Sequence, residues 1–207
     1  MVHITCSDSQ GAFLHLPWQA VRFPLEWQAP EGFHADDLST WPRVEGRLEY
    51  VSGRLRYMPP CGGIQQEVAT DVTRLLADWA DSHLEFAVGS NEAGMLLGGE
   101  VRGADAAVWR RGEAGTASGL RRVPPVLAVE VAGQDEEENA LREKAGWYLA
   151  AGVCAVWLVL PETREVIVVT AGRESRHPRG ERLPARPELP GLEPEVAAFF
   201  RQLDRKS

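Results

Sequence analysis

The chain has 207 residues, of which 44% are apolar and 25% are charged, and its formal net charge is −8 at pH 7. This composition is typical of a globular protein that buries a sizeable core without disulfides or a structural metal. The negative charge argues against a tight, sequence-blind nucleic-acid binder, because such binding depends on Lys and Arg displacing counterions from phosphates. It does not exclude a nuclease.

The cysteines and the hydropathy pattern bear on where the protein works. Cys6, Cys61 and Cys154 lie far apart without CxxC spacing, which fits neither a disulfide framework nor a zinc ribbon. A reducing cytoplasm is the simplest interpretation. The N-terminus has no basic region, and no apolar run approaches about 18 residues, so we expect neither export nor a membrane span.

Residues 1–42 are predicted to form an extended arm that packs on the remaining domain, residues 43–207. Aromatic residues and prolines alternate along this segment, a pattern typical of extended chain held by its aromatic side chains. The aromatic residues are Trp18, Phe23, Trp27, Phe33 and Trp41. Asp36 and Asp37 can begin one short helix, which must end before Pro42.

The next elements are a hairpin, a helix and several short strands. Residues 47–51 and 54–58 alternate in polarity around Ser52-Gly53, which predicts a β-hairpin. Apolar residues then recur at helical spacing over residues 64–82. Short strands are expected at residues 84–88, 94–97 and 105–109, followed by a surface loop over residues 112–122.

The second half contains the most apolar strand. Residues 126–131 form an apolar run interrupted by Glu130 alone, which predicts a strand buried on both faces. A helix follows over residues 135–151, with four acidic residues at the positive end of its dipole. Strands at 153–160 and 166–170 and a closing helix at 194–203 complete the order. The predicted fold is a mixed α/β domain with a central mixed β-sheet flanked by helices.

Two carboxylates stand out in this pattern. Glu130 ends the most apolar strand, so if buried it must be paired, bound to a metal or protonated. The alternative is an ordinary strand end that faces solvent. Asp105 opens another apolar strand, although Asp before a strand is also a common turn residue.

Lys144 is the third candidate. It lies beside Leu141 and Tyr148 on the core-facing side of the second helix, and no acidic residue lies three or four positions away. We therefore expect its ammonium to meet a carboxylate on another element, most naturally Glu130. The alternative is a lysine that extends to solvent at the edge of the apolar stripe.

The scarcity of lysine strengthens the interest of this position. Only Lys144 and Lys206 are lysines, and the rest of the 22 basic residues are arginines. A compact ammonium in a tight metal site is a place where arginine cannot readily substitute. Two carboxylates with a neighbouring lysine suit Mg²⁺ and phosphodiester chemistry, since Mg²⁺ takes few protein oxygens and shares its shell with water and phosphate.

These residues lie within a longer set of motifs. The set comprises Leu48-Glu49-Tyr50-Val51-Ser52-Gly53-Arg54-Leu55, Gln65, Gly94, Ala104-Asp105-Ala106-Ala107-Val108, Val129-Glu130-Val131, Arg142-Glu143-Lys144, Trp147-Tyr148, Gly152-Val153 and Leu189-Pro190-Gly191-Leu192. In order and spacing, the chain resembles the Uma-two-type restriction endonuclease family of the PD-(D/E)xK nuclease superfamily, over roughly residues 33–200.

The resemblance implies a restriction-endonuclease-like core and a Mg²⁺-dependent DNA endonuclease, with Mn²⁺ as a possible substitute. It implies that Asp105 and Glu130 bind the metal and that Lys144 is the catalytic lysine. Glu49 and Gln65 match family positions near the site and are expected to support it. Because cutting both strands of a duplex usually needs two sites, we also expect a homodimer.

The chain departs from the family pattern at several positions. The superfamily lysine two residues after the Glu is replaced by Ala132, and in this family the lysine is expected from the following helix. The Pro before Asp105 is Ala104, and a Ser-Pro-Ser type segment is Ala132-Gly133-Gln134. Ile64 stands where a His is expected beside Gln65, which removes a proton carrier or phosphate contact.

Other functions therefore stay open. A catalytically silent nuclease fold could serve as a binding or regulatory module. An RNA-directed nuclease is less favoured, because the sequence lacks interleaved aromatic and basic residues that stack single strands. Arginines before and within the hairpin, and others around the loop at 112–122, either face phosphates or are scattered on the surface. They are Arg43, Arg47, Arg54, Arg56, Arg110, Arg111, Arg121 and Arg122.

Overall fold

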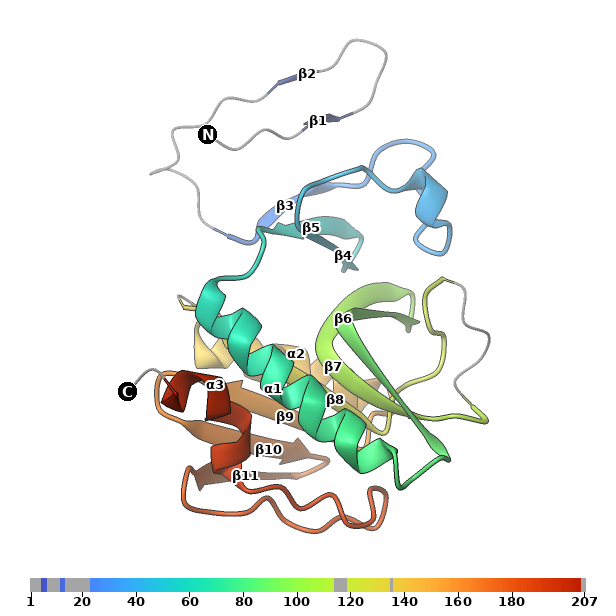
Figure 1. Ribbon diagram of the computed structural model, residues 1–207. Helices are drawn as coiled ribbons and strands as arrows, with labels where there is room; N and C mark the ends of the chain where they lie inside the picture. The colour runs from blue at the N-terminus through green and yellow to red at the C-terminus, as the bar shows by residue number, and fades with distance from the viewer. Residues whose placement is uncertain (1–4, 7–11, 14–22, 114–118, 135, 206–207) are drawn as a thin grey trace. The chain divides into compact units, whose positions relative to one another are not determined.

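A computed structural model describes residues 5–6, 12–13, 23–113, 119–134 and 136–205. The chain divides into two compact units, the first comprising Met1–Pro60 with Leu96–Arg102 and the second Cys61–Met95 with Gly103–Ser207. Trp18 of the predicted arm, residues 114–118 of the predicted loop and Asp135 at the predicted helix start lie outside the described residues. Figure 1 shows the elements of each unit.

The first unit contains a small antiparallel sheet, and the predicted hairpin is confirmed to the residue. β4 (Arg47–Val51) pairs with β5 (Arg54–Met58). Ser52 and Gly53 both have positive φ, 49° and 79°. A two-residue hairpin turn with this backbone matches the twist of the strands that it joins. β3 (Leu25–Gln28) pairs with the outer edge of β5. β1 (Thr5–Cys6) and β2 (Ala12–Phe13) form a separate antiparallel pair.

Aromatic contacts hold the segment between β3 and β4. The ring of Phe33 lies 5.3 Å from that of Trp41 and 5.0 Å from that of Tyr50, measured between centroids. The short predicted helix is the 3₁₀ turn η2 (Leu38–Thr40), in which the Ser39 amide donates to the carboxylate of Asp37. Hydrogen bonds from Ser39 lower the pKa of Asp37. The division into residues 1–42 and 43–207 stays a prediction.

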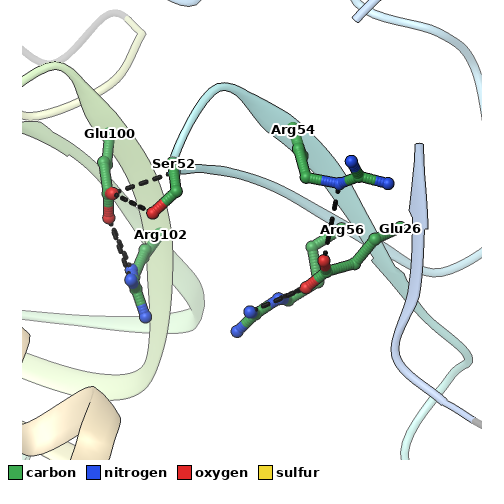
Figure 2. A network of polar contacts seen from close by, with 6 residues as sticks. All are labelled: Glu26, Ser52, Arg54, Arg56, Glu100 and Arg102. Carbon is green, nitrogen blue, oxygen red and sulfur yellow. Dashed lines mark hydrogen bonds and ion pairs between the residues drawn. The ribbon is translucent and has the colours of Figure 1, made fainter. Parts of the chain in front are cut away.

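Charged side chains of the first unit pair with one another (Figure 2). Glu26 of β3 accepts from Arg56 Nε at 2.8 Å and lies 3.6 Å from Arg54 Nε. Glu100 pairs with Arg102 at 2.9 Å and accepts the Ser52 amide at 2.9 Å. Burial opposes ionisation of Glu100, but the hydrogen bonds from Arg102 and Ser52 outweigh it and lower the pKa of the carboxyl.

The second unit is built on a sheet with strand order β11-β10-β9-β8-β7. Its members are β7 (Glu100–Arg110, from Gly103 onward), β8 (Leu127–Val131), β9 (Ala155–Leu160), β10 (Glu165–Thr170) and β11 (Arg173–Pro178). β8 and β9 are parallel, and the other pairs are antiparallel. Every residue of β8 is buried, as its apolar run predicts.

Helices cover both faces of this sheet. α1 (Gly63–Ala80) packs Val68 and Val72 into the main core with Val129 of β8. α2 (Glu138–Ala150) connects the parallel strands β8 and β9 and lies against the opposite face of the sheet. Side chains alternate along a strand, so Glu130, next to Val129, points to the face that α2 covers, where it contacts Lys144. Figure 1 shows α1 and α2 on opposite sides of the sheet. The predicted mixed sheet flanked by helices is confirmed.

Several predicted boundaries are wrong, for physical reasons. The strands expected at 84–88 and 94–97 are one strand, β6 (Phe86–Leu97), which pairs with β7. Gly89 lies within this strand, where a Cβ would lie 2.8 Å from the Trp109 ring, so the glycine allows close packing. β7 begins at Glu100 rather than Asp105, because main-chain pairing continues through the polar start of the strand.

The C-terminal region also differs from the prediction. β11 was not expected, because its mostly polar residues form an edge strand through main-chain pairing with β10 alone. α2 begins at Glu138, three residues later than predicted. The closing helix is the 3₁₀ helix η3 (Val196–Phe200) followed by one turn, α3 (Arg201–Asp204). None of the helices in the described ranges is long and apolar enough to cross a membrane.

An ion-pair network on the second unit predicts a pH dependence of stability. Arg176 of β11 donates to Glu138 of α2 and to Glu165 of β10, and Arg142 joins Glu138 to Glu174. Hydrogen bonding to these arginines contributes to the lowered pKa of all three carboxyls, with Thr163 the largest contributor at Glu165. A carboxyl with a lowered pKa stabilises the folded state above its unfolded pKa, and this contribution is lost as pH falls through the folded pKa.

Arg176→Ala is therefore expected to lower the free energy of unfolding by about 1 kcal/mol at pH 6, given the exposure of these pairs. At pH 3 the difference from the wild type should shrink, because the partners become protonated. Urea unfolding across this pH range measures it. Arg182→Ala removes a more exposed arginine, which pairs with Glu195, and should leave the profile unchanged. Parallel pH profiles for the wild type and Arg176→Ala would contradict the prediction.

Candidate active site

Glu130 and Lys144 form a buried ion pair in the second unit. Glu130 lies at the end of β8 with 3% of its surface exposed, and Lys144 of α2 is 8% exposed. Their Nζ and Oε2 atoms lie 2.9 Å apart. The predicted pairing is confirmed, while the solvent-facing alternatives for both residues are wrong. Because two charges without water need further hydrogen bonds, the surroundings of the pair matter.

Two further groups complete the surroundings of this pair. Lys144 Nζ donates to the main-chain oxygen of Gly103 in β7 at 2.8 Å. Tyr148, one helical turn after Lys144 and fully buried, donates its hydroxyl to Glu130 Oε1 at 2.6 Å. Each carboxylate oxygen of Glu130 therefore accepts a hydrogen bond from α2, which fixes the orientation of the carboxylate.

Sequence reasoning missed this role of Tyr148. The residue fits the apolar stripe of α2, and an aromatic residue in such a stripe is ordinarily read as core. A signal was available in the spacing, because residues four apart on a helix lie on the same face. A hydroxyl on the face that carries Lys144 can reach the same carboxylate.

Asp105 and Gln65 meet the main chain beside Glu130. The β7–β8 ladder pairs Ala106 with Val129 and does not continue further. Beyond it, Asp105 Oδ2 accepts the Val131 amide at 2.7 Å, and Gln65 Nε2 of α1 donates to the Val131 carbonyl at 2.9 Å. Two side chains thus replace strand pairing on the β7 side of Val131, while the pairing of β8 with β9 continues to this residue. Asp105 lies inside β7, so its reading as a turn residue is wrong.

The remaining predicted residues lie as follows. Glu49 is in β4 of the first unit, where it is buried and paired in register with Arg56. Its role in the site stays a prediction. Ile64 is exposed in the first turn of α1, next to Gln65. An isoleucine at this exposed position can neither transfer a proton nor hydrogen-bond a phosphate.

The donor chemistry fits a cation held jointly with substrate. Among the residues that the structure describes, no group of three or more His, Cys, Asp or Glu side chains is arranged to hold a metal ion. Asp105 and Glu130 instead provide two carboxylates around the end of β8. Mg²⁺ commonly binds through one or two carboxylates and completes its shell with water and substrate phosphate. Asp105 and Glu130 supply oxygen ligands of the kind that Mg²⁺ takes.

The sequence left open whether eight arginines face phosphates or are scattered on the surface, and most of them serve packing and internal pairing. Arg110 lies over the Phe86 ring at 5.3 Å and Arg121 over the Trp109 ring at 4.5 Å, measured to the centroids. Arg111 donates to the carbonyls of Leu84 and Phe86. In the first unit, Arg54 and Arg56 pair with Glu26. These contacts favour arginines that stabilise their own unit over a phosphate-binding surface.

Comparisons with known proteins agree with this fold. A family model described as "Putative restriction endonuclease", Uma2, matches residues 35–199. Among solved structures, the chain is similar to a protein from Anabaena variabilis described as "a putative nuclease belonging to DUF820". The TM-score is 0.72 at 15% sequence identity, covering 83% of this chain and 99% of the other. At this identity the likeness shows the fold alone. No curated protein matches the chain. The chain belongs to the Uma2 restriction endonuclease family.

Proposed function

We propose that the protein is a Mg²⁺-dependent DNA endonuclease that hydrolyses phosphodiester bonds, with Asp105, Glu130 and Lys144 at its active centre. The observation that carries the proposal is the buried contact of 2.9 Å between Lys144 and Glu130. One of only two lysines in an arginine-rich chain lies against a carboxylate at the end of the central strand. Family membership and a nuclease fold support the reaction class.

The contacts of each residue indicate its role in the proposed reaction. Asp105 and Glu130 would hold Mg²⁺, which when bound lowers the pKa of a coordinated water and offsets phosphate charge. Tyr148 and Lys144 orient Glu130 through its two oxygens. The Lys144 ammonium places a fixed positive charge where negative charge develops on the phosphate, so it stabilises the transition state without reorganisation. Gln65 secures the strand end to α1.

Cleavage assays at low salt test the proposal. Duplex, single-stranded and branched DNA, with RNA as a comparison, should be incubated with Mg²⁺, with Mn²⁺ and with chelator. We expect cleavage of at least one DNA form in the presence of metal and none in chelator. Absence of metal-dependent cleavage across all DNA forms would contradict the proposal.

That absence would favour the second candidate function, a silent nuclease fold that acts as a binding or regulatory module. The observation behind it is Ile64, exposed beside Gln65 where the family resemblance implies a His. Ile64→His separates the two functions. A gain of cleavage in this variant over an inactive wild type would show that only the proton carrier or phosphate contact is lacking. A variant that stays inactive would leave the binding module as the better function.

Two further proposals accompany this function. Double-strand cleavage by one active site per chain favours a homodimer with two-fold symmetry. Light scattering should then give twice the chain mass of 22.8 kDa, and a monomer at working concentration would contradict it. The cysteine usage favours a cytoplasmic location.

Tyr148→Phe tests the orientation of Glu130. The variant loses a hydrogen bond to a charged group, which is worth about 1.5–3 kcal/mol, so kcat is expected to fall about tenfold to hundredfold. Because Tyr148 acts through Glu130, KM for DNA should stay unchanged. Tyr57→Phe is the matched control, since the Tyr57 hydroxyl donates at 2.7 Å to the carbonyl of Glu45 in the first unit. A loss of stability in Tyr148→Phe without a change in kcat would reduce Tyr148 to a structural residue.

A further inference from the structure

A groove of about 570 Å³ runs along α1 of the second unit and includes Asp105 in its lining. This volume lies within the usual range of ligand sites, about 300–1,000 Å³. Most side chains that line it are small or neutral and polar, including Gln66, Thr70, Thr73, Ser90 and Asn91. The two charged residues of the lining are Asp105 and Arg74. The predicted metal ligand and one arginine therefore share a single groove.

A buried carboxylate on the same helix, Asp71, holds the Arg74 side chain in place. Its Nη2 donates to Asp71 Oδ1 at 2.9 Å. Asp71 is itself buried, and its other oxygen accepts the Gln202 amide at 2.7 Å. Asp71 is thus fixed by the C-terminal segment and fixes Arg74 in turn. An arginine that is already positioned loses less entropy when it binds a ligand.

The Arg74 guanidinium can still donate hydrogen bonds to an anion. A guanidinium carries five N–H donors in a planar fork that matches phosphate oxygens, and 40% of the Arg74 side chain is exposed. Arg74 differs in this respect from Arg110 and Arg121, whose guanidinium groups lie on aromatic rings. Its position in the groove, rather than the net charge of the chain, suits Arg74 to contact a phosphate.

We propose that this groove binds the substrate DNA strand on one side of the cleavage point, with Arg74 contacting a phosphate near the one that Asp105 addresses. The inference rests on the proposed function and adds where the substrate lies. The neutral hydroxyl and amide side chains suit sugars and base edges, while Arg74 supplies the anion contact. Because Arg74 is the one cation among the described residues of the lining, affinity should depend only weakly on salt.

The first experiment measures DNA affinity without cleavage. Fluorescence anisotropy with a labelled oligonucleotide in chelator should show about tenfold weaker binding for Arg74→Gln, and a log Kd against log salt slope reduced by about 0.7–0.9, as expected for one lost phosphate contact. Arg176→Gln is the matched control. Its side chain is 39% exposed and ion-paired in the same unit but outside the groove lining, so its affinity and slope should equal those of the wild type.

A second experiment leaves Arg74 and its contact with Asp71 intact. Cys61 lies in the groove lining, and Cys154 is an exposed thiol outside that lining. In a Cys6→Ser background, saturating DNA should slow maleimide modification of Cys61 severalfold and leave the rate at Cys154 unchanged. The Cys154 thiol in the same molecule controls for any general effect of DNA on the reagent.

The outcomes of these experiments distinguish a failure of the proposed groove from a failure of the proposed function. If the wild type binds DNA but Arg74→Gln binds equally well and Cys61 is not protected, the groove is wrong and the proposed function stands. If the wild type binds no DNA form at low salt, the DNA substrate and the groove are both overturned. Weaker binding by Arg74→Gln together with protection of Cys61 supports the proposal.

Discussion

Lys144→Met is expected to abolish DNA cleavage and to lower the free energy of unfolding by about 3–5 kcal/mol, the usual cost of breaking a buried ion pair. The stability loss arises because Glu130, 3% exposed, loses the ammonium 2.9 Å away. Urea unfolding and a cleavage assay measure the two effects separately. Lys206→Met is the matched control, since it removes the only other lysine, and should leave both quantities unchanged.

The double variant Lys144→Met/Glu130→Gln separates the structural role from the chemical one. Replacing both partners by neutral groups of similar size removes the uncompensated charge, and such replacements are often neutral for stability. We therefore expect most of the lost stability to return while cleavage stays absent. Tyr148 can still donate to the amide oxygen of the new Gln. Recovery of cleavage in the double variant would show that Lys144 serves only to compensate Glu130.

The pairing of Lys144 with Glu130 could be predicted because burial constrains charged groups so strongly. An acidic residue at the end of an apolar strand and a lysine on the core side of the next helix each need a partner, and the β8–α2–β9 connection brings them together. The hairpin of β4 and β5 and most of α1 could be predicted for a similar reason, since their hydrophobic periodicity is unbroken.

Features that depend on distant main chain could not be predicted. Asp105 and Gln65 both bond Val131 because the β7–β8 ladder ends there, and no local pattern marks the end of a ladder. Asp71 and Arg74 look like an ordinary pair on a helix surface. Only the contact with Gln202, 131 residues away, shows that Asp71 is buried and fixed. β11 lacks an apolar alternation because it pairs with one neighbour at the edge of the sheet.

Substitutions of Asp105 test the proposed metal site most directly. Asp105→Asn and Asp105→Ala are both expected to lower kcat about a thousandfold, because metal assistance contributes several kcal/mol to such reactions. Calorimetric titration with Mg²⁺ or Mn²⁺ should show binding to the wild type and none to either variant. Asp204→Asn removes a surface carboxylate paired with Arg179 and should change neither result.

The two variants differ in what they do to the Val131 amide. The Asn side chain retains an oxygen that can accept this hydrogen bond, which is 2.7 Å long with Asp105. The free energy of unfolding of Asp105→Asn should therefore equal that of the wild type. Asp105→Ala leaves the N–H without its acceptor and should cost a further 1–3 kcal/mol of stability, roughly. If Asp105→Asn keeps metal binding and cleavage, the carboxylate charge is dispensable and the proposed site is wrong. If it loses both with unchanged stability, the charge of Asp105, and not its hydrogen bond to the strand end, is what the reaction requires.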